Sequence, residues 1–444
     1  MFTNTNTLTK LERLLDLAKQ KGASEAEVIQ MTSTENPVNF ENNKLKALES
    51  NESSGISLRV IKDKKIGISS STNADALEEI VDSAVVASEY GQEALFKFSK
   101  ENINCRGLIN QTPTPLESLI KRGTDTIESL KPLHKDLLIS GGFNLSRHET
   151  TYINSNGVHG RQTKTIYSTS FYANLVRGED FLGIYEGNCS LSDFPDEKEI
   201  SKTISKKFNF SSKNISLKTK KYPVIFTPAA VSSIFGYIFS VILNGKAVEQ
   251  KVSPLFDKLG KKMFDKKLTL TEDPDIGINK AEFDDEGIKT KKKDLIKEGI
   301  VNSFYFDLNT ACRDVARYIS TGNGFKASLS SAPSPALTTL VIKNGNKNLP
   351  YQDMIKNIKE GIIVDQLLGA GQSNTLLGEF NVGIDLGFKI EEGEIQGRIK
   401  NCMVAGNIFD VLKNIQEIST EQEWVYGTGL YPYFLIDEMT VAGK

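Results

Sequence analysis

A strict alternation of apolar and polar residues near the end of the chain constrains its fold most strongly. Across residues 380–390 every second position is apolar, and Asn, Gly, Asp or Lys stands between. Successive side chains of a β-strand point to opposite faces of a sheet, so this segment predicts a strand with one buried face. A Glu-Gly turn follows at 392–393, and residues 295–307 predict a further hairpin. Strands joined by tight turns with few intervening helices predict antiparallel sheets and the α+β class.

The remaining patterns divide the chain into two domains. Apolar residues recur at helical spacing in three segments, residues 8–21, 72–91 and 116–130. Strand-like patterns recur in four segments, residues 55–68, 136–146, 163–175 and 181–190. Residues 205–221 are rich in Ser, Asn and Lys and show no clear period, which predicts a boundary. We expect an N-terminal mixed α/β domain over residues 1–212 and a C-terminal domain rich in antiparallel sheet over residues 213–444.

One long uncharged run raises the question of a membrane span. Residues 222–245 carry no charged side chain, which is nominally enough chain to cross a bilayer. Pro223 opens a β-rich run, and Pro228 stands where the first turn of a helix would begin. A strand followed by a helix fits this pattern better than one long helix. We therefore expect a buried strand, a buried helix at residues 228–243, and no contact with a membrane.

Charge and cysteine usage exclude several classes of protein. Lys and Arg number 54 against 56 Asp and Glu, so a formal charge of -2 gives no net attraction to nucleic acid. Cys105, Cys189, Cys312 and Cys402 lie far apart and form no C-x-x-C pair, which is typical of a reducing compartment. The N-terminal segment lacks the basic and apolar regions of an export signal. We expect a cytoplasmic protein that binds no nucleic acid.

The common enzyme motifs are missing from the chain. Glycine clusters at 322–324 and 369–371 complete no phosphate-binding fingerprint, so we interpret them as turns. His134, His148 and His159 are the only histidines, and the chain has neither a G-x-S-x-G elbow nor an H-E-x-x-H pair. Composition and motifs therefore name no activity.

Clusters of like charge do not indicate a functional site either. Asp284, Asp285 and Glu286 form the densest acidic group and could hold a hard cation. Adjacent acids followed by Gly are more typical of a solvated turn, which is the structure we predict. The Lys-rich runs at 258–267 and 289–293 alternate with acids, so we expect solvated faces there.

Several segments in both halves carry a family resemblance by their order and spacing. They are the hairpin SSGISLRVIKDKKIGISSST and residues 152–165, 223–239, 252–264, 283–301 and 436–444. Together they resemble the TldD/PmbA family, bacterial and archaeal proteins once labelled modulators of DNA gyrase and now grouped with metallopeptidases. In the TldD-like branch of that family, a helix near the start of the second domain carries H-E-x-x-x-H, and a cysteine near the C-terminus completes a zinc site.

The resemblance implies that this chain lacks the zinc site. The slots of the helical motif fall near Gly236, Tyr237 and Val241. Gly and Val offer no ligand atom, and a neutral phenol is a poor replacement for Glu as general base. The matching tail, residues 423–427, contains no cysteine, and Cys402 belongs to an earlier turn.

The apolar character of the helix agrees with a lost site. Seven residues surround it almost completely, which predicts a fully buried element: Ile234, Phe235, Tyr237, Ile238, Phe239, Val241 and Ile242. The chain therefore resembles the PmbA branch, also called TldE, whose members lack the zinc motif and pair with a TldD-like chain.

That resemblance implies a function shared between two subunits. We expect a metal-free, non-catalytic subunit of a zinc peptidase complex that degrades or processes unfolded and small peptides. The zinc is expected in the TldD-like partner, the assembly is a heterodimer or larger, and a homodimer stays open. No catalytic residue and no cofactor is assigned to this chain.

Two alternatives remain open at this point. One is a regulatory binding protein of the gyrase-modulator type that acts without peptidase activity. The other is an autonomous hydrolase with a relocated site, drawing on His134, His148, His159 and the acidic cluster at 284–286.

Overall fold

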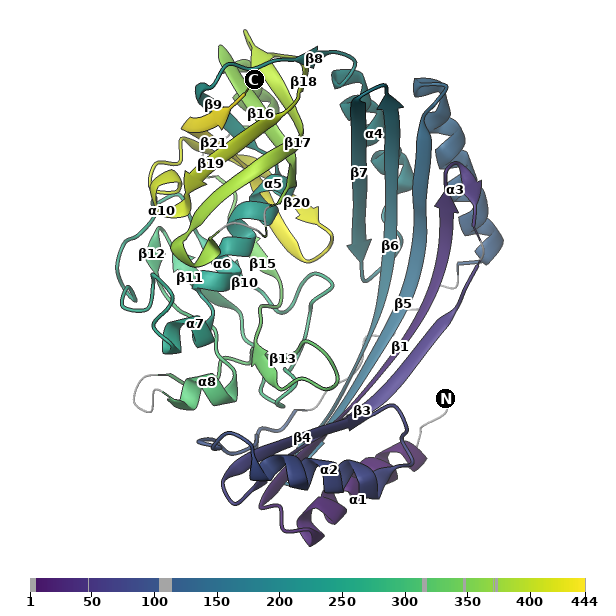
Figure 1. The fold of residues 1–444 in the computed structure, drawn as a ribbon, viewed down its shortest axis with the longest axis vertical. Helices are drawn as coiled ribbons and strands as arrows, with labels where there is room; N and C mark the ends of the chain where they lie inside the picture. The colour runs from purple at the N-terminus through teal and green to yellow at the C-terminus, as the bar shows by residue number, and fades with distance from the viewer. Residues whose placement is uncertain are drawn as a thin grey trace.

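Two sheets stand side by side in the computed structural model, which describes residues 5–46, 48–103, 114–313, 318–345, 349–369, 371 and 374–443. Figure 1 shows a long curved sheet from the first part of the chain beside a more compact body from the second part. Helices accompany both sheets, so the predicted α+β class is confirmed.

The long sheet is antiparallel throughout the described residues. Its order is β4-β3-β1-β5-β6-β7, with β2 paired to β1. Its strands are β1 (Glu25–Glu41), β2 (Lys44–Leu45), β3 (Asn51–Lys62), β4 (Lys65–Ser71), β5 (Leu138–Asn154), β6 (His159–Arg177) and β7 (Asp180–Ser190). The hairpin and the three strands predicted for this half are confirmed. At roughly 3.3 Å per residue, β5 and β6 run most of the height of the molecule (Figure 1).

Helices cover the two ends of the long sheet separately. They are α1 (Thr5–Gln20), α2 (Leu77–Glu89), α3 (Leu116–Leu130), the 3-10 turn η1 (Lys131–Leu133) and α4 (Glu197–Phe210). The first two pack at one end on β1 and β3 around Leu14, Val28 and Leu58. The other two helices lie near the opposite end (Figure 1). The three helices predicted in this half are confirmed.

Helix α4 corrects the prediction that residues 205–221 lack regular structure. It runs to Phe210 and buries Ile204 completely, and the Asp196 carboxylate caps it by accepting from the Lys198 amide at 2.9 Å. Most other apolar contacts of this helix are only partly buried, so its polar surface hides the helical period. The chain then enters the second sheet at β8, and the exact domain boundary stays a prediction.

The second sheet has the order β12-β11-β10-β15-β21-β9-β16-β17-β18-β8, with β19 joining β17 and β21, and β20 joining β21. Its strands are β8 (Asn214–Ile215), β9 (Lys220–Phe226), β10 (Leu270–Glu272), β11 (Lys293–Lys297), β12 (Ile300–Val301), β15 (Leu340–Ile342), β16 (Glu360–Leu368), β17 (Glu379–Glu391), β18 (Glu394–Ile399), β19 (Cys402–Asn407), β20 (Glu417–Val425) and β21 (Gly429–Ala442). A separate small hairpin joins β13 (Gly324–Lys326) and β14 (Pro333–Pro335).

The strongest strand predictions of the second half are confirmed. The alternating segment forms β17, and residues 295–307 contain the turn between β11 and β12. Glu298 and Gly299 occupy that turn with φ of 48° and 79°. Among the described residues, three strand pairs are parallel, β9 with β16, β15 with β21 and β8 with β18, while the other pairs are antiparallel.

Short helices complete the second half. They are α5 (Pro228–Val231), the π-helical turn η2 (Ser232–Gly236), α6 (Tyr237–Ile242), α7 (Gly245–Glu249), α8 (Leu308–Arg313), α9 (Tyr351–Lys356), η4 (Thr375–Leu377) and α10 (Ile408–Val411). The uncharged run is thus a strand followed by a helix, as predicted. None of the helices among the described residues is long and apolar enough to cross a membrane.

The two sheets share buried side chains. One apolar cluster includes Phe171 of β6, Ile204 of α4, Ile225 of β9 and Leu386 of β17. Helix α4 contacts β6, β7 and β18, so it bridges the sheets. The two halves of the chain are therefore packed against each other, and a cavity between them has walls from both halves.

Candidate functional site

The helix that carries the zinc-motif slots begins as its sequence predicts. The Thr227 side chain accepts a hydrogen bond from the Ala230 amide, and Pro228 occupies the first helical position. The helix continues from α5 through η2 into α6; α5 contacts β16 and β21, whereas α6 contacts η4 and α7. A π-helical turn adds one residue to the turn, so the faces before and after η2 are offset.

The slot at Gly236 is closed by an aromatic side chain. A Cβ atom at this position would lie 3.0 Å from the Tyr431 hydroxyl oxygen. Tyr431 belongs to β21, and burial raises its pKa to about 12. An imidazole at Gly236 would need the space that this phenol fills.

The other two slots offer no better fit for zinc. Tyr237 is 43% exposed and Val241 is half-buried. The prediction that apolar residues enclose this helix on all sides is therefore wrong for the face that carries Tyr237. Within the described ranges, no three His, Cys, Asp or Glu side chains converge as metal ligands. The residues at these slots do not fit a zinc ion.

The tail segment matching the ligand cysteine forms the turn between β20 and β21. Tyr426 and Gly427 hold the turn with φ of 51° and 66°. The carbonyl of Trp424 accepts a hydrogen bond from Asn188 Nδ2 at 3.1 Å, which ties the turn to β7. Cys402 is buried at the start of β19, where it pairs with Ile384 of β17.

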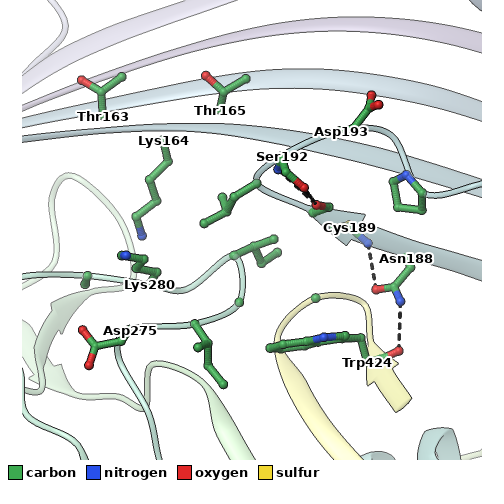
Figure 2. Close-up of a pocket in the computed structure, with 18 of the residues that line it drawn as sticks. Thr163, Lys164, Thr165, Asn188, Cys189, Ser192, Asp193, Asp275, Lys280 and Trp424 are labelled. Atoms are coloured by element: carbon green, nitrogen blue, oxygen red, sulfur yellow. Dashed lines mark hydrogen bonds between the residues drawn. The ribbon is translucent and has the colours of Figure 1, made fainter. Parts of the chain in front are cut away.

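A cavity of about 710 Å³ lies beside this turn, between the long sheet and the second half of the chain. Figure 2 shows its wall, to which β6, the end of β7, the segment after β7, a loop near Asp275 and the Trp424 turn contribute. Its volume falls in the roughly 300–1,000 Å³ range of small-ligand sites. This cavity is the main candidate site.

The β6 side of the cavity is an open sheet edge. β5 pairs with β6 from His159 onward, whereas β7 pairs only with residues 167–177 of β6. Among the described residues, the second edge of β6 therefore has no strand partner before residue 167. Gln162, Thr163, Lys164 and Thr165 line the cavity in succession. Neighbouring residues from both faces of a strand can line one cavity only when it lies along the strand edge.

Charged side chains give the cavity its chemistry. Lys164 and Lys280 line it, and among the described residues neither has an ion-pair partner. Burial lowers the pKa of Lys164. Thr165 is 4% exposed, and its buried Oγ1 atom, which has no hydrogen-bond partner in the described structure, is not exposed to the cavity. Asp193, Asp275 and Glu282 line the same cavity, so its wall carries charged groups of both signs.

A second cavity of about 370 Å³ lies on the other side of the same turn. Trp424 lines both cavities. In the second one, Lys207 of α4 donates to Glu186 of β7 at 2.5 Å and to Asp365 of β16 at 2.6 Å. Burial raises the pKa of Glu186 to about 6. This cluster fastens the long sheet to the second sheet.

The acidic group at 284–286 is buried, which corrects the prediction of a solvated turn. Asp284 and Glu286 are 0% exposed and Asp285 is 7% exposed. The Asp284 carboxylate accepts from the amides of Ile288 and Gly324 at 2.9 and 2.8 Å. The hydrogen bonds that water would form in a solvated turn are thus formed by backbone amides, one of which, that of Gly324, is distant in sequence.

Arg59 of β3 completes this buried cluster. Its guanidinium donates to Glu286 Oε1 at 3.0 Å and to Glu27 Oε1 at 2.6 Å, and it lies over the rings of Phe96 and Phe98. Burial raises the pKa of Glu286 to about 7, against the attraction of Arg59. The cluster joins β1 and β3 of the long sheet to the second half of the chain.

The other residues considered from sequence stay dispersed. His148 pairs with Lys164 and His159 with Ile153, so the two histidines lie at different levels of the sheet, while His134 follows η1. Cys189 and Cys312 are half-buried free thiols, and Cys105 lies outside the described residues. Gly322 and Gly369 have positive φ, as turns require, while residue 370 lies outside the described residues. The Lys-rich runs are largely exposed, while Lys292 and Lys293 pair with the buried carboxylates of Asp273 and Glu272.

No local pattern marks Lys164, Lys280 or Trp424 as site residues. Their proximity depends on where β7 ends and on how the turn after β20 docks against it. No local signal in the sequence marks the open edge, because it depends on where β7 stops pairing with β6.

Family comparisons agree across both halves of the chain. Residues 219–443 match the model of the PmbA/TldA metallopeptidase C-terminal domain, and residues 26–88 match PmbA/TldA metallopeptidase domain 1. An uncharacterized protein of Methanocaldococcus jannaschii is 26% identical over 413 residues, covering 91% of this chain and 93% of that protein. The metalloprotease PmbA of Escherichia coli O157:H7 is 30% identical over 234 residues, covering 51% of this chain and 47% of that protein.

A solved structure extends this similarity to the whole fold. The crystal structure of TldE from Thermococcus kodakarensis superposes with a TM-score of 0.85 and covers 98% of this chain and 100% of that chain. Its sequence is 24% identical, so this likeness shows the shared fold.

Proposed function

The chain belongs to the PmbA/TldD metallopeptidase family, and we propose that it is the non-catalytic subunit of a TldD/TldE-type zinc peptidase complex. In this proposal a TldD-like partner carries the zinc, and the complex degrades or processes unfolded and small peptides. The present chain supplies a docking surface and contacts to the peptide. The free thiols Cys189, Cys312 and Cys402 suit a cytoplasmic complex.

The contact between Gly236 and Tyr431 carries this proposal. A zinc peptidase needs ligand atoms around an open coordination position. Here the first slot lacks a side chain and the space above it is filled by a phenol. The family's remaining slots hold Tyr237 and Val241, and residues 423–427 contain no thiol. Zinc, if supplied by the partner, would polarise a peptide carbonyl and activate water; this chain's residues would bind and orient the peptide.

Purification of the chain alone and together with a TldD-like chain tests the proposal. We expect hydrolysis of a labelled, unfolded polypeptide by the pair, with inhibition by a chelator, and none by this chain alone. Elemental analysis should find zinc in proportion to the partner. Chelator-sensitive hydrolysis by the isolated chain would overturn the proposal and favour a relocated site.

A matched variant separates assembly from catalysis. Substituting the partner's motif glutamate by Gln should abolish hydrolysis while leaving the complex intact on size-exclusion chromatography. If the two chains do not associate, or if association changes no peptidase activity, the alternative of a regulatory binding protein is favoured instead.

A further inference from the structure

Four large apolar side chains remain exposed at one edge of the second half. Three of them, Val252, Phe256 and Leu259, belong to the loop that follows α7, and the fourth is Ile300 of β12. Their exposed fractions lie between 37% and 50%. Figure 1 shows β12 on the side of this half that faces away from the long sheet. Isolated exposed apolar residues are ordinary, whereas a group of them is typical of a binding surface.

Hydrogen bonds join the loop to β12. The Gly260 amide donates to the Val301 carbonyl at 2.7 Å, and the Val301 amide donates to the Lys261 carbonyl at 3.0 Å. Lys262 then forms an antiparallel bridge with Ile300. The loop and the strand therefore form one continuous surface, and the outer edge of β12 is already paired.

Lysines dominate the charge of this surface. Residues 251–267 and 297–300, which we call the basic apolar surface, contain seven lysines and three acids, although the whole chain has a net charge of -2. Two of the acids, Asp257 and Asp265, already pair with lysines of the loop, and the third is Glu298 at the tip of the hairpin. The surface therefore keeps an excess of positive charge, which attracts acidic groups.

One row across the strands combines the apolar and the cationic character. In antiparallel pairs, directly opposite residues project from the same face. Ile300 lies opposite Lys262 on one side and opposite Lys297 on the other. Both lysines are exposed, and among the described residues neither belongs to an ion pair. The row offers a guest an apolar contact with a cation on each side.

Three kinds of occupant suit this surface poorly. Apolar side chains that are at most half exposed lie too low to insert among the acyl chains of a bilayer. Nucleic acid favours arginine for bidentate contacts, and all seven cations here are lysines. Strand addition needs a free edge, which the loop has taken from β12. Recognition must therefore come from side chains that pack on the surface.

We propose that the basic apolar surface binds an amphipathic helix of a partner protein, with an apolar stripe over Ile300 and Asp or Glu side chains beside Lys262 and Lys297. Apolar residues three and four positions apart form such a stripe, and acids on both of its borders match the charge of the row. The inference goes beyond the proposed peptidase complex, because it involves neither cavity and needs no zinc-bearing subunit.

A synthetic helix tests the proposal on the full chain. The probe is a capped, fluorescein-labelled peptide of about 18 residues, with Leu at helical spacing and Glu on both borders of the stripe. We expect saturable binding, measured by fluorescence anisotropy. A matched peptide with Gln in place of every Glu should bind about tenfold more weakly. A third peptide with the same composition as the probe but a scrambled stripe should not bind.

The three peptides separate charge from shape. Equal affinity of the Glu and Gln peptides would overturn the charge assignment. Equal affinity of the probe and the scrambled peptide would overturn the helix as the bound element.

Variants of the protein test the location. Lys262→Gln with Lys297→Gln should lower the affinity for the Glu peptide about fivefold and leave that for the Gln peptide unchanged. Ile300→Thr keeps the β-branched shape and should weaken both peptides about threefold. Lys19→Gln with Lys198→Gln removes two exposed lysines of α1 and α4 and should change neither affinity. Equal losses in the two double variants would overturn the site.

Competing occupants are distinguished by separate measurements. Cosedimentation with phosphatidylserine vesicles that depends on Lys262 and Lys297 would make a lipid surface the occupant. Self-association in sedimentation velocity, lost in the same double variant, would make a second copy of this chain the occupant. Loss of peptide binding on addition of a TldD-like chain would assign the surface to the interface with that subunit. Each of these three results would overturn the proposal.

Discussion

Arg59 and Glu286, which are 227 positions apart in sequence, form a buried ion pair through two hydrogen bonds of 3.0 Å. One residue belongs to the long sheet and the other to the second half of the chain. Because Glu27 accepts from the same guanidinium, a single cation serves two buried carboxylates.

Removal of the arginine should therefore destabilise the whole protein. Arg59→Met keeps an apolar stem but leaves Glu27 and Glu286 without their cation, so we expect a loss of about 3–5 kcal/mol in the free energy of unfolding. Urea unfolding measures it. Arg161→Met, which breaks the exposed pair with Glu149, should cost less than about 1 kcal/mol. Equal losses in the two variants would contradict this account of the cluster.

The acidic cluster should make stability fall as pH rises. Burial raises the pKa of Asp285 to about 6 and that of Glu286 to about 7 in the folded protein. A raised folded pKa stabilises the fold below the unfolded pKa, and this contribution is lost as pH rises through the folded value. We expect the free energy of unfolding to decrease between about pH 4 and about pH 7, from the unfolded to the folded pKa values of the two carboxyls.

Asp285→Asn tests that pH dependence. An amide oxygen can still accept the hydrogen bond from the Lys326 amide, which is 2.8 Å away, but the side chain no longer ionises. The decrease in stability with pH should become smaller by about 1–3 kcal/mol in this variant. Asp16→Asn, on the exposed face of α1, serves as control. A pH profile unchanged by Asp285→Asn would exclude this residue as a source.

The packing at Gly236 predicts that restoring a ligand fails. Gly236→His forces the imidazole against Tyr431, so we expect destabilisation of about 1–3 kcal/mol and no bound zinc. Tyr237→His lies on an exposed face and should change stability by less than about 0.5 kcal/mol. Thermal unfolding and elemental analysis measure the two effects. Stoichiometric zinc in the Gly236→His variant would contradict the packing argument.

The unpartnered hydroxyl at Thr165 should cost stability in the free protein. Thr165→Val removes a buried oxygen that has no hydrogen-bond partner in the described structure, so we expect a gain of about 1 kcal/mol. Thr126→Val removes a similarly buried hydroxyl that donates to the Arg122 carbonyl at 2.8 Å, and should cost about 1 kcal/mol. Denaturant unfolding measures the change in the free energy of unfolding of each variant. Changes of the same sign in the two variants would contradict the difference between an unpartnered and a hydrogen-bonded hydroxyl.

Predictions made from sequence succeed where the evidence is local. The alternation at residues 380–390 is visible because one face of β17 is buried along its whole length. The pair Pro223 and Pro228 likewise separates a strand from a helix without tertiary knowledge. The family resemblance, drawn from segments in both halves, is confirmed by models that match both.

The predictions from sequence are wrong where residues distant in the chain determine whether a segment is buried. The acids at 284–286 are buried because Arg59 and the amides of Gly324 and Lys326 donate hydrogen bonds to their carboxylates. These donors are distant in sequence, so the residues next to the acids do not predict them. Helix α4 escapes detection because Ile204 is nearly alone in being fully buried on it. The exposed face at Tyr237 follows the π-helical turn η2, which offsets the helical faces before and after it, so the apolar run does not reveal which face is buried.

The candidate cavity could not be located from sequence for a further reason. The cavity wall at Lys164 exists because β6 is longer than β7 and extends beyond it. The relative length of two paired strands depends on how the whole sheet assembles, which neither strand's sequence shows. The docking of Trp424 against Asn188 is equally non-local.

Two buried ion clusters, one at Arg59 and one at Lys207, connect the two halves of the chain. The candidate cavity lies at the same interface. A hinge motion that widened the gap would separate a desolvated carboxylate from its cation, at several kcal/mol. The gap therefore behaves as a slot of fixed width. The width of the cavity is therefore set by the same ion pairs that hold the two halves of the chain together.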